Sequence, residues 1–174
     1  MLFSAKLFAT EAELDKARKV YYKATKDEDY VESAFDHFKK IKSKYDEYDA
    51  VSTIYIGSLT MLQGRYAFWP QTKLDYVNKG MKLMEKGLKM NPDNIESLFI
   101  YGSTYYFLPF FFGKKDDAEE KLKYIIDNLN GEVYNNYNNE ILTNALEFII
   151  EYIELTDKER NKVNKFLRKL SSVE

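Results

Sequence analysis

The sequence contains no cysteine, only three prolines and only seven glycines among its 174 residues. Without cysteine there can be no disulfide bonds and no thiolate metal ligands. Proline and glycine both interrupt helices, so their scarcity favours a largely helical chain. The single histidine, His37, has no second histidine or cysteine with which to complete a transition-metal site. We therefore expect no metal and no other cofactor.

The sequence also lacks an excess of charge of one sign, because 26 Lys and Arg residues nearly balance 28 Asp and Glu residues. Dedicated nucleic-acid-binding proteins usually carry a basic excess, so no nucleic-acid partner is expected. No stretch approaches the roughly 20 apolar residues of a transmembrane helix. The sequence also lacks a glycine-rich phosphate loop and a nucleophile elbow. These absences predict a protein that is not an enzyme and has no transmembrane segment.

The first nine residues allow two interpretations. They can form an ordinary first helical turn packed on the core, or they can be the remnant of a trimmed secretory signal ending in Leu-Phe-Ala. The segment is short and Lys6 interrupts its apolar run, which favours the first interpretation. The compartment stays open: the protein is cytoplasmic if Met1 is the native start, and exported or periplasmic if a signal was removed.

Apolar residues recur every three and four positions along most of the chain, which predicts helices. Eight are expected, over residues 10–26, 27–45, 49–68, 72–90, 93–107, 114–131, 140–155 and 156–170. The asparagine-rich residues 132–140 are expected to form a loop. Short links favour antiparallel helix pairs. Helix-end signals are capping-box spacings at Thr10 with Glu13 and at Thr156 with Glu159, an N-cap at Asp93 or Asn94, and a terminating Gly131.

Corresponding positions repeat between successive helix pairs. Leu98, Tyr101, Gly102 and Tyr105 match Thr53, Ile56, Gly57 and Thr60; in the following helices Ala118, Leu122 and Ile125 match Gly80, Met84 and Gly87, before Pro92. The pattern resembles the tetratricopeptide repeat, which alternates small and large residues on two helices and ends in proline. Small residues at these positions would let the paired helices approach closely while large neighbours fill the gaps.

The resemblance implies an all-α, right-handed α-α superhelix of about three helix pairs plus a C-terminal capping pair. It places a single domain over residues 1–174, with repeats over about 10–130 and capping helices over about 138–172. It also implies a non-enzymatic scaffold that binds a protein or peptide on its concave face. The family's groove positions correspond here to Ile54, Ser58, Met61, Leu62, Phe99, Ser103, Tyr106 and Phe107. The alternative is that the capping helices cover this face as core.

The spacing departs from the family, because Gly57 and Gly102 are 45 residues apart where a unit has about 34. The extra residues lie within each pair, in "YAFWPQT" and "YYFLPFFFGKK", and a similar insertion occurs in a branch of bacterial tetratricopeptide-like proteins. Exposing such side chains forgoes roughly 1.5–3 kcal/mol each, which favours packing them as core. The alternative is an exposed binding patch formed by Phe68, Trp69, Leu108, Phe110, Phe111 and Phe112.

Two further function classes remain open. An aromatic pocket between groove and insertions would suit a small-molecule or lipid-binding accessory protein. An exposed insertion edge would suit a self-associating structural module, and so a homo-oligomer.

Overall fold

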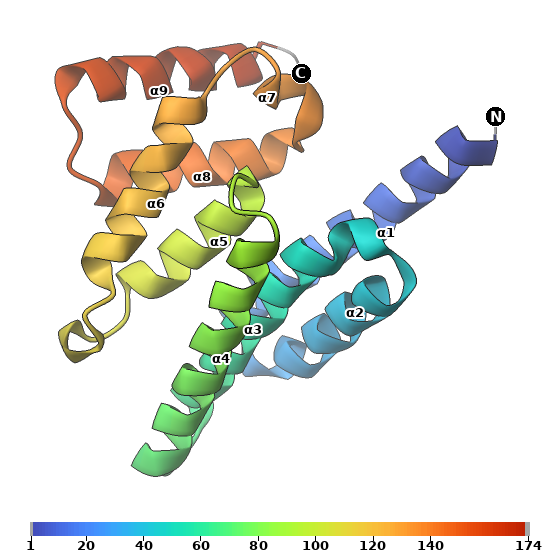
Figure 1. Cartoon of the computed structure of the whole chain (residues 1–174), viewed down its shortest axis with the longest axis vertical. Coiled ribbons are helices and arrows are strands. Elements are labelled where there is room, and N and C mark those ends of the chain that lie inside the picture. The colour runs from blue at the N-terminus through green and yellow to red at the C-terminus, as the bar shows by residue number, and fades with distance from the viewer. Residues whose placement is uncertain (1, 173–174) are drawn as a thin grey trace. The chain divides into compact units, whose positions relative to one another are not determined.

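The computed structural model describes residues 2–172, and this part of the chain is helical with no β-strand (Figure 1). Short 3-10 turns occur at Glu28–Tyr30, Asp46–Tyr48 and Phe110–Phe112. Along the described chain, no helix combines the length and apolar character needed to cross a membrane. The α-helices are α1 (Leu2–Ala24), α2 (Val31–Lys44), α3 (Asp49–Tyr66), α4 (Pro70–Met90), α5 (Ile95–Tyr106), α6 (Lys115–Asn128), α7 (Val133–Asn136), α8 (Asn139–Tyr152) and α9 (Asp157–Leu170).

All eight predicted helices form, with two corrections at their ends and one in a predicted loop. Helix α1 begins at Leu2, so Thr10 is a buried residue inside the helix and not its N-cap. Helix α6 ends at Asn128, and Gly131 lacks the positive φ of a terminating glycine. The expected loop over residues 132–140 contains the short helix α7. The prediction that residues 1–9 pack on the core concerns side chains outside those that the structure describes.

The chain divides into two compact units at Pro92, inside the region where repeats were predicted. Unit 1 is Met1–Pro92 and contains α1 to α4, and unit 2 is Asp93–Glu174 and contains α5 to α9. The single domain expected over residues 1–174 stays a prediction. The superhelical arrangement of the helix pairs remains a prediction.

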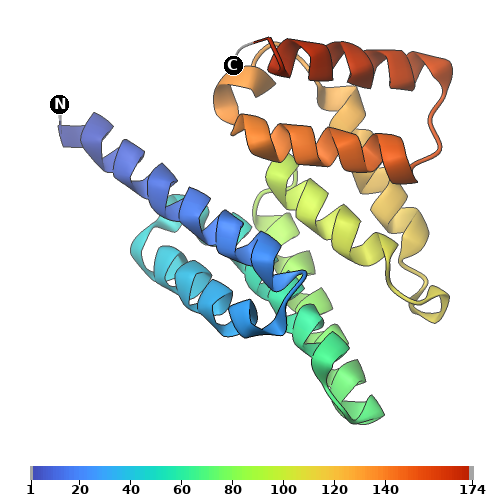
Figure 2. The same cartoon turned by 180° about the vertical axis from the view of Figure 1, so that it is seen from behind.

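Consecutive helices of unit 1 pack against one another, and α1 runs antiparallel to α2 (Figure 2). Aromatic rings fill the core between the first three helices. Tyr55 of α3 stacks on Phe38 of α2 at 4.2 Å between ring centroids and meets Tyr21 of α1 edge-on at 4.8 Å. A buried hydrogen bond of 2.8 Å joins the Tyr21 hydroxyl to Ser58 of α3. These contacts fix α3 against both preceding helices.

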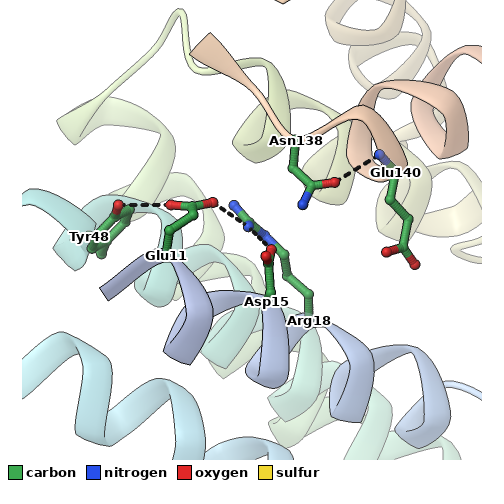
Figure 3. Close-up of polar contacts among 6 residues, drawn as sticks. All are labelled: Glu11, Asp15, Arg18, Tyr48, Asn138 and Glu140. Carbon is green, nitrogen blue, oxygen red and sulfur yellow. Dashed lines mark hydrogen bonds and ion pairs between the residues drawn. The ribbon is translucent and has the colours of Figure 1, made fainter. Parts of the chain in front are cut away.

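A hydrogen-bonded cluster around the buried Arg18 ties α1 to the connection between α2 and α3 through Glu11 and Tyr48 (Figure 3). The Arg18 guanidinium donates to Glu11 at 2.7 Å and to Asp15 at 2.6 Å. The Tyr48 hydroxyl donates to the second oxygen of Glu11 at 2.9 Å. Burial and the neighbouring Glu11 carboxylate raise the pKa of Tyr48 well above its ordinary value. The charged cluster therefore has a structural role, because it holds α1 against the connection that carries Tyr48.

Helices α3 and α4 approach so closely that their backbones touch, as the small residues in the sequence predicted. A Cβ atom on Gly57 would lie 2.8 Å from the Gly80 carbonyl oxygen, and one on Gly87 would lie 2.9 Å from the Ala50 oxygen. Gly64 similarly faces the Lys73 oxygen at 3.1 Å. Along α3 the contact positions rise in number from Ala50 to Gly64, while their partners on α4 fall from Gly87 to Lys73. The two helices are therefore antiparallel. We call this row of contacts the glycine seam.

Unit 2 is built from the pairs α5–α6 and α8–α9. The Asn94 side chain accepts from the Ser97 backbone N–H at 2.8 Å, which confirms it as the N-cap of α5. The Ile95 N–H, another donor left open at that helix start, bonds the Tyr137 hydroxyl at 3.1 Å. At the start of α9, Thr156 and Glu159 form the predicted capping box.

Candidate binding surfaces

Three of the predicted groove residues in unit 1 are buried and point at neighbouring helices. Ile54 and Met61 pack on α4 across the glycine seam, and Ser58 bonds Tyr21 of α1. Leu62 is half-buried. A partner cannot reach the three buried side chains, so this part of the expected groove is corrected to core.

In unit 2, helix α8 packs against part of the predicted groove face of α5. Phe99 is buried and meets Phe148 of α8 at 6.0 Å between ring centroids. Ser103 is half-buried, and its hydroxyl donates to the Phe99 carbonyl oxygen at 2.7 Å. Phe99 and Ser103 are thus structural residues in this unit.

The last two predicted groove residues belong to a partly exposed aromatic cluster. Phe107 is 62% exposed, and its ring meets Phe148 at 5.9 Å and Tyr152 at 5.2 Å. The Tyr106 ring lies 6.0 Å from Phe148, and its hydroxyl donates to the Tyr152 carbonyl oxygen at 2.8 Å. We call these four residues the aromatic cluster. It joins the end of α5 to the end of α8.

The connection between α5 and α6 projects two of its aromatic rings into solvent. Phe110 is 92% exposed and Phe111 is 64% exposed, while Leu108 and Phe112 are half-buried. The Phe111 ring packs on Phe112 at 4.7 Å and on Phe110 at 6.0 Å. The prediction that this segment packs as core is wrong for Phe110 and Phe111. The energetic preference for burial of these two rings is not satisfied within unit 2.

Backbone hydrogen bonds hold this turn in one shape. The N–H groups of Phe112 and Gly113 donate to the carbonyl oxygens of Pro109 and Phe110 at 3.0 and 2.9 Å. Gly113 has φ +60°, a left-handed conformation that glycine adopts without a Cβ clash. Because the turn is tied down, the Phe110 and Phe111 rings are presented from a preformed support.

Lysines border the same surface. The Lys115 ammonium lies 4.9 Å from the centroid of the Tyr106 ring, within the range of a cation–π contact. The next residues of α6, Asp116 and Asp117, are acidic, and Asp117 accepts from the Tyr101 hydroxyl at 2.5 Å. The charge beside the aromatic cluster is therefore nearly balanced.

A second aromatic turn lies in unit 1, between α3 and α4. Phe68 is 84% exposed and Trp69 is 65% exposed, and their rings meet edge-on at 5.1 Å. This connection is only Ala67 to Trp69, because α3 and α4 are 18 and 21 residues long. The extra residues predicted as a turn insertion mostly lengthen the two helices here.

The half-buried Phe148 and the exposed Tyr152 were not predicted as surface residues from the sequence. Both lie on the amphipathic helix α8, whose apolar residues were expected only to close the fold. Their four-residue spacing and their position near the end of the helix are the signals that could have identified them. Among residues 2–172, no group of three or more His, Cys, Asp or Glu side chains could hold a metal ion.

Comparison with protein-family models, with curated proteins and with solved structures finds no match for the chain.

Proposed function

We propose that the protein is a non-enzymatic scaffold that binds a protein partner through the aromatic surface of unit 2. This surface consists of the aromatic cluster together with the exposed rings of the α5–α6 turn: Tyr106, Phe107, Phe110, Phe111, Phe148 and Tyr152. The observation that carries the proposal is the 92% exposure of Phe110 on a hydrogen-bonded turn.

Exposed rings of this kind are the usual anchors of protein interfaces. Aromatic residues are enriched among the few side chains that supply most of the binding energy. Each ring has only two side-chain torsions, so ordering it on binding costs little entropy. The preformed turn that carries Phe110 and Phe111 lowers that cost further.

The shape and charge of the surface favour an apolar segment of a protein over a small ligand. Small-molecule sites are concave and enclose most of the ligand, whereas Phe107 and Phe110 project into solvent. The lysines Lys114 and Lys115 are followed by Asp116 and Asp117, so charge alone selects no strongly charged partner. A complementary apolar pocket or helix on another protein fits these features.

The tetratricopeptide-like superhelix is part of the same proposal. Its support is the pairing of successive helices and the close approach of α3 to α4 at Gly57 and Gly80. The fold alone does not define a partner. The aromatic surface, and not the concave face, carries the binding in this proposal.

Site-specific photocrosslinking tests it. The photoreactive p-benzoylphenylalanine replaces Phe111 in the full chain, expressed in the cells from which the sequence comes. We expect a discrete protein adduct on irradiation, which disappears when Phe107→Ser and Phe110→Ser are added. The same photoreactive residue at exposed Lys158 on α9 is the matched control and should give no such adduct.

The alternative adducts separate the competing functions. A second copy of this chain as the adduct would identify the self-associating module in place of a scaffold. A lipid adduct at Phe111 would contradict a protein partner at this surface. The absence of any adduct specific to Phe111 would overturn the proposal.

A further inference from the structure

We infer that the α3–α4 turn is a membrane-contacting site that takes anionic phospholipid. We call it the basic aromatic tip: Phe68, Trp69 and Leu74 with Arg65 and Lys73. It lies in unit 1 and shares no residue with the surface proposed above to bind protein. A test of the membrane-contacting site is therefore independent of the proposed protein-binding surface.

The apolar side chains of the tip are exposed within unit 1. Phe68, Trp69 and Leu74 are 84%, 65% and 45% exposed. They project from the end of a helical hairpin. A membrane surface is deformable, so these side chains can insert into it without a matching pocket. Tryptophan is enriched where membranes meet water, because its ring is apolar and its N–H is polar.

The charge around the tip complements anionic headgroups. Residues 65–82 contain four basic side chains and one acidic side chain, Asp75, although the whole chain has a net charge of -2. Arg65 and Lys73 are exposed, one on each helix beside the turn. Basic residues near a membrane surface are attracted by the negative potential of anionic lipids.

This charge distinguishes the tip from the α5–α6 turn. There the two lysines are followed at once by Asp116 and Asp117. Beside the tip, Asp75 is the one acidic residue within the first three turns of α4. The aromatic rings are similar in the two turns, and the surrounding charge favours a lipid surface for only one of them.

The spacing along α4 suits the depth of an interface. Lys73 follows Trp69 by four residues, which is about 6 Å along a helix axis. Interfacial side chains reach roughly 5–10 Å into the boundary between headgroups and acyl chains. With the rings at that boundary, the Lys73 ammonium lies at the depth of the phosphate groups. The exposed Arg65, whose guanidinium donates to the Thr25 carbonyl oxygen at 3.5 Å, adds positive charge beside them.

The tip is also rigid, so little order has to be gained on contact. Pro70 opens α4 and fixes its own φ, while Trp69 is extended at φ -85° and ψ 135°. The backbone N–H of Lys73 donates to the Trp69 carbonyl oxygen at 3.0 Å. The glycine seam holds the two helices that carry the turn.

The test uses the full chain and its own fluorescence. Trp69 is the single tryptophan, so its emission reports directly on the tip. We expect vesicles of equal parts phosphatidylcholine and phosphatidylglycerol to shift the emission to shorter wavelength and to co-sediment the protein. Vesicles of phosphatidylcholine alone should bind at least about tenfold more weakly, and raised salt should weaken binding to the anionic vesicles.

Three variants make the result specific. Phe68→Ser keeps the reporter and should weaken binding to anionic vesicles about tenfold. Arg65→Glu with Lys73→Glu should weaken it further, whereas Lys158→Glu with Arg160→Glu makes the same charge change on α9 and should have little effect. Phe110→Ser with Phe111→Ser should leave vesicle binding unchanged, which separates this site from the proposed protein-binding surface.

Several results would overturn the inference. These are no emission shift with anionic vesicles at low salt, equal binding to both vesicle types, or equal loss in the α9 control. A shift that grows with protein concentration without vesicles would mean that a second copy covers the tip. Circular dichroism of each variant checks folding, which these exposed substitutions should not change.

Discussion

A Cβ atom on Gly80 would lie 2.5 Å from the Gly57 carbonyl oxygen and 2.2 Å from Cγ of Met61. Backbone atoms cannot yield as the end of a side chain can. We therefore expect Gly80→Ala to force α3 and α4 apart and to lower the free energy of unfolding by about 2–3 kcal/mol. Urea denaturation of the full chain measures this change.

Gly131→Ala is the matched control for the same chemical change. A Cβ atom at Gly131 meets nothing within 4 Å, and its φ is not positive. The control should stay within about 0.5 kcal/mol of the parent protein. Equal effects of the two substitutions would contradict backbone contact at the glycine seam.

The left-handed conformation of Gly113 supports the exposed α5–α6 turn. Gly113→Ala should lower the stability of the turn by about 1 kcal/mol, because an L side chain is strained at φ +60°. Gly113→Asn should cost less, since asparagine tolerates this conformation. Thermal unfolding and amide hydrogen exchange at Phe112 and Gly113 measure the two effects. An alanine variant as stable as the asparagine variant would contradict the strain argument.

The exposed rings should be dispensable for folding. Phe110→Ser with Phe111→Ser should leave the unfolding midpoint nearly unchanged, because neither ring is buried. Phe38→Ala, which removes a fully buried ring stacked on Tyr55, should cost about 3–5 kcal/mol. A double serine variant that unfolds would show that the turn is core after all.

Light scattering over a concentration series extends this prediction. If the parent chain is a dimer and the double serine variant a folded monomer, the α5–α6 turn is a self-association surface. A monomeric parent is the result expected from a surface reserved for another protein.

Folding stability should depend on pH near neutrality, and this dependence can be assigned to the single histidine, His37. Burial, with Lys16 and Lys40 nearby, holds the pKa of His37 below 6.5, against the opposite effects of Asp36 and Glu13. The unfolded chain therefore takes up a proton at a higher pH than the folded chain. We expect stability to fall as the pH drops below about 6.5 towards the folded pKa.

His37→Gln provides the control for this titration. It should remove the loss of stability between pH 7 and the range where carboxylates begin to titrate. Urea denaturation at a series of pH values measures both proteins. Parallel pH profiles for the parent and the variant would exclude His37 as the source.

The contribution of the capping box to stability can be tested by removing the Thr156 hydroxyl. The Thr156 hydroxyl accepts from the Glu159 N–H, and the Glu159 carboxylate accepts from the Thr156 N–H. Thr156→Ala should lower stability by about 1 kcal/mol, while Thr156→Ser should retain most of it. Equal loss in both variants would point to the threonine methyl group in place of the hydrogen bond.

The helical fold could be predicted because periodicity and caps are local signals. Asn94, Thr156 and Glu159 act within one turn of the chain, and the structure confirms them. Thr10 has the same capping-box spacing, but the helix extends through it because the preceding residues are also compatible with helix. Local patterns thus identified the helices better than their ends.

The candidate surfaces were harder to predict because exposure depends on tertiary packing. Proline and aromatic residues pointed to the turns of Phe68 and Phe110, but the free energy of burial favoured a core position for both, and both are exposed. Ile54 and Met61 matched groove positions, but the glycine seam turns them towards α4. The contact of Phe148 with Phe107 depends on where α8 packs in the fold, which the sequence did not predict.

The glycine seam also has a consequence for how the hairpin could change length in evolution or design. Its glycines recur every seven residues, at Gly57 and Gly64 on α3 and at Gly80 and Gly87 on α4. Inserting one heptad into each helix would preserve the register and carry Trp69 about 10 Å farther from the rest of unit 1. The hairpin therefore behaves as a spacer of adjustable reach, in which the aromatic turn and the core can vary independently.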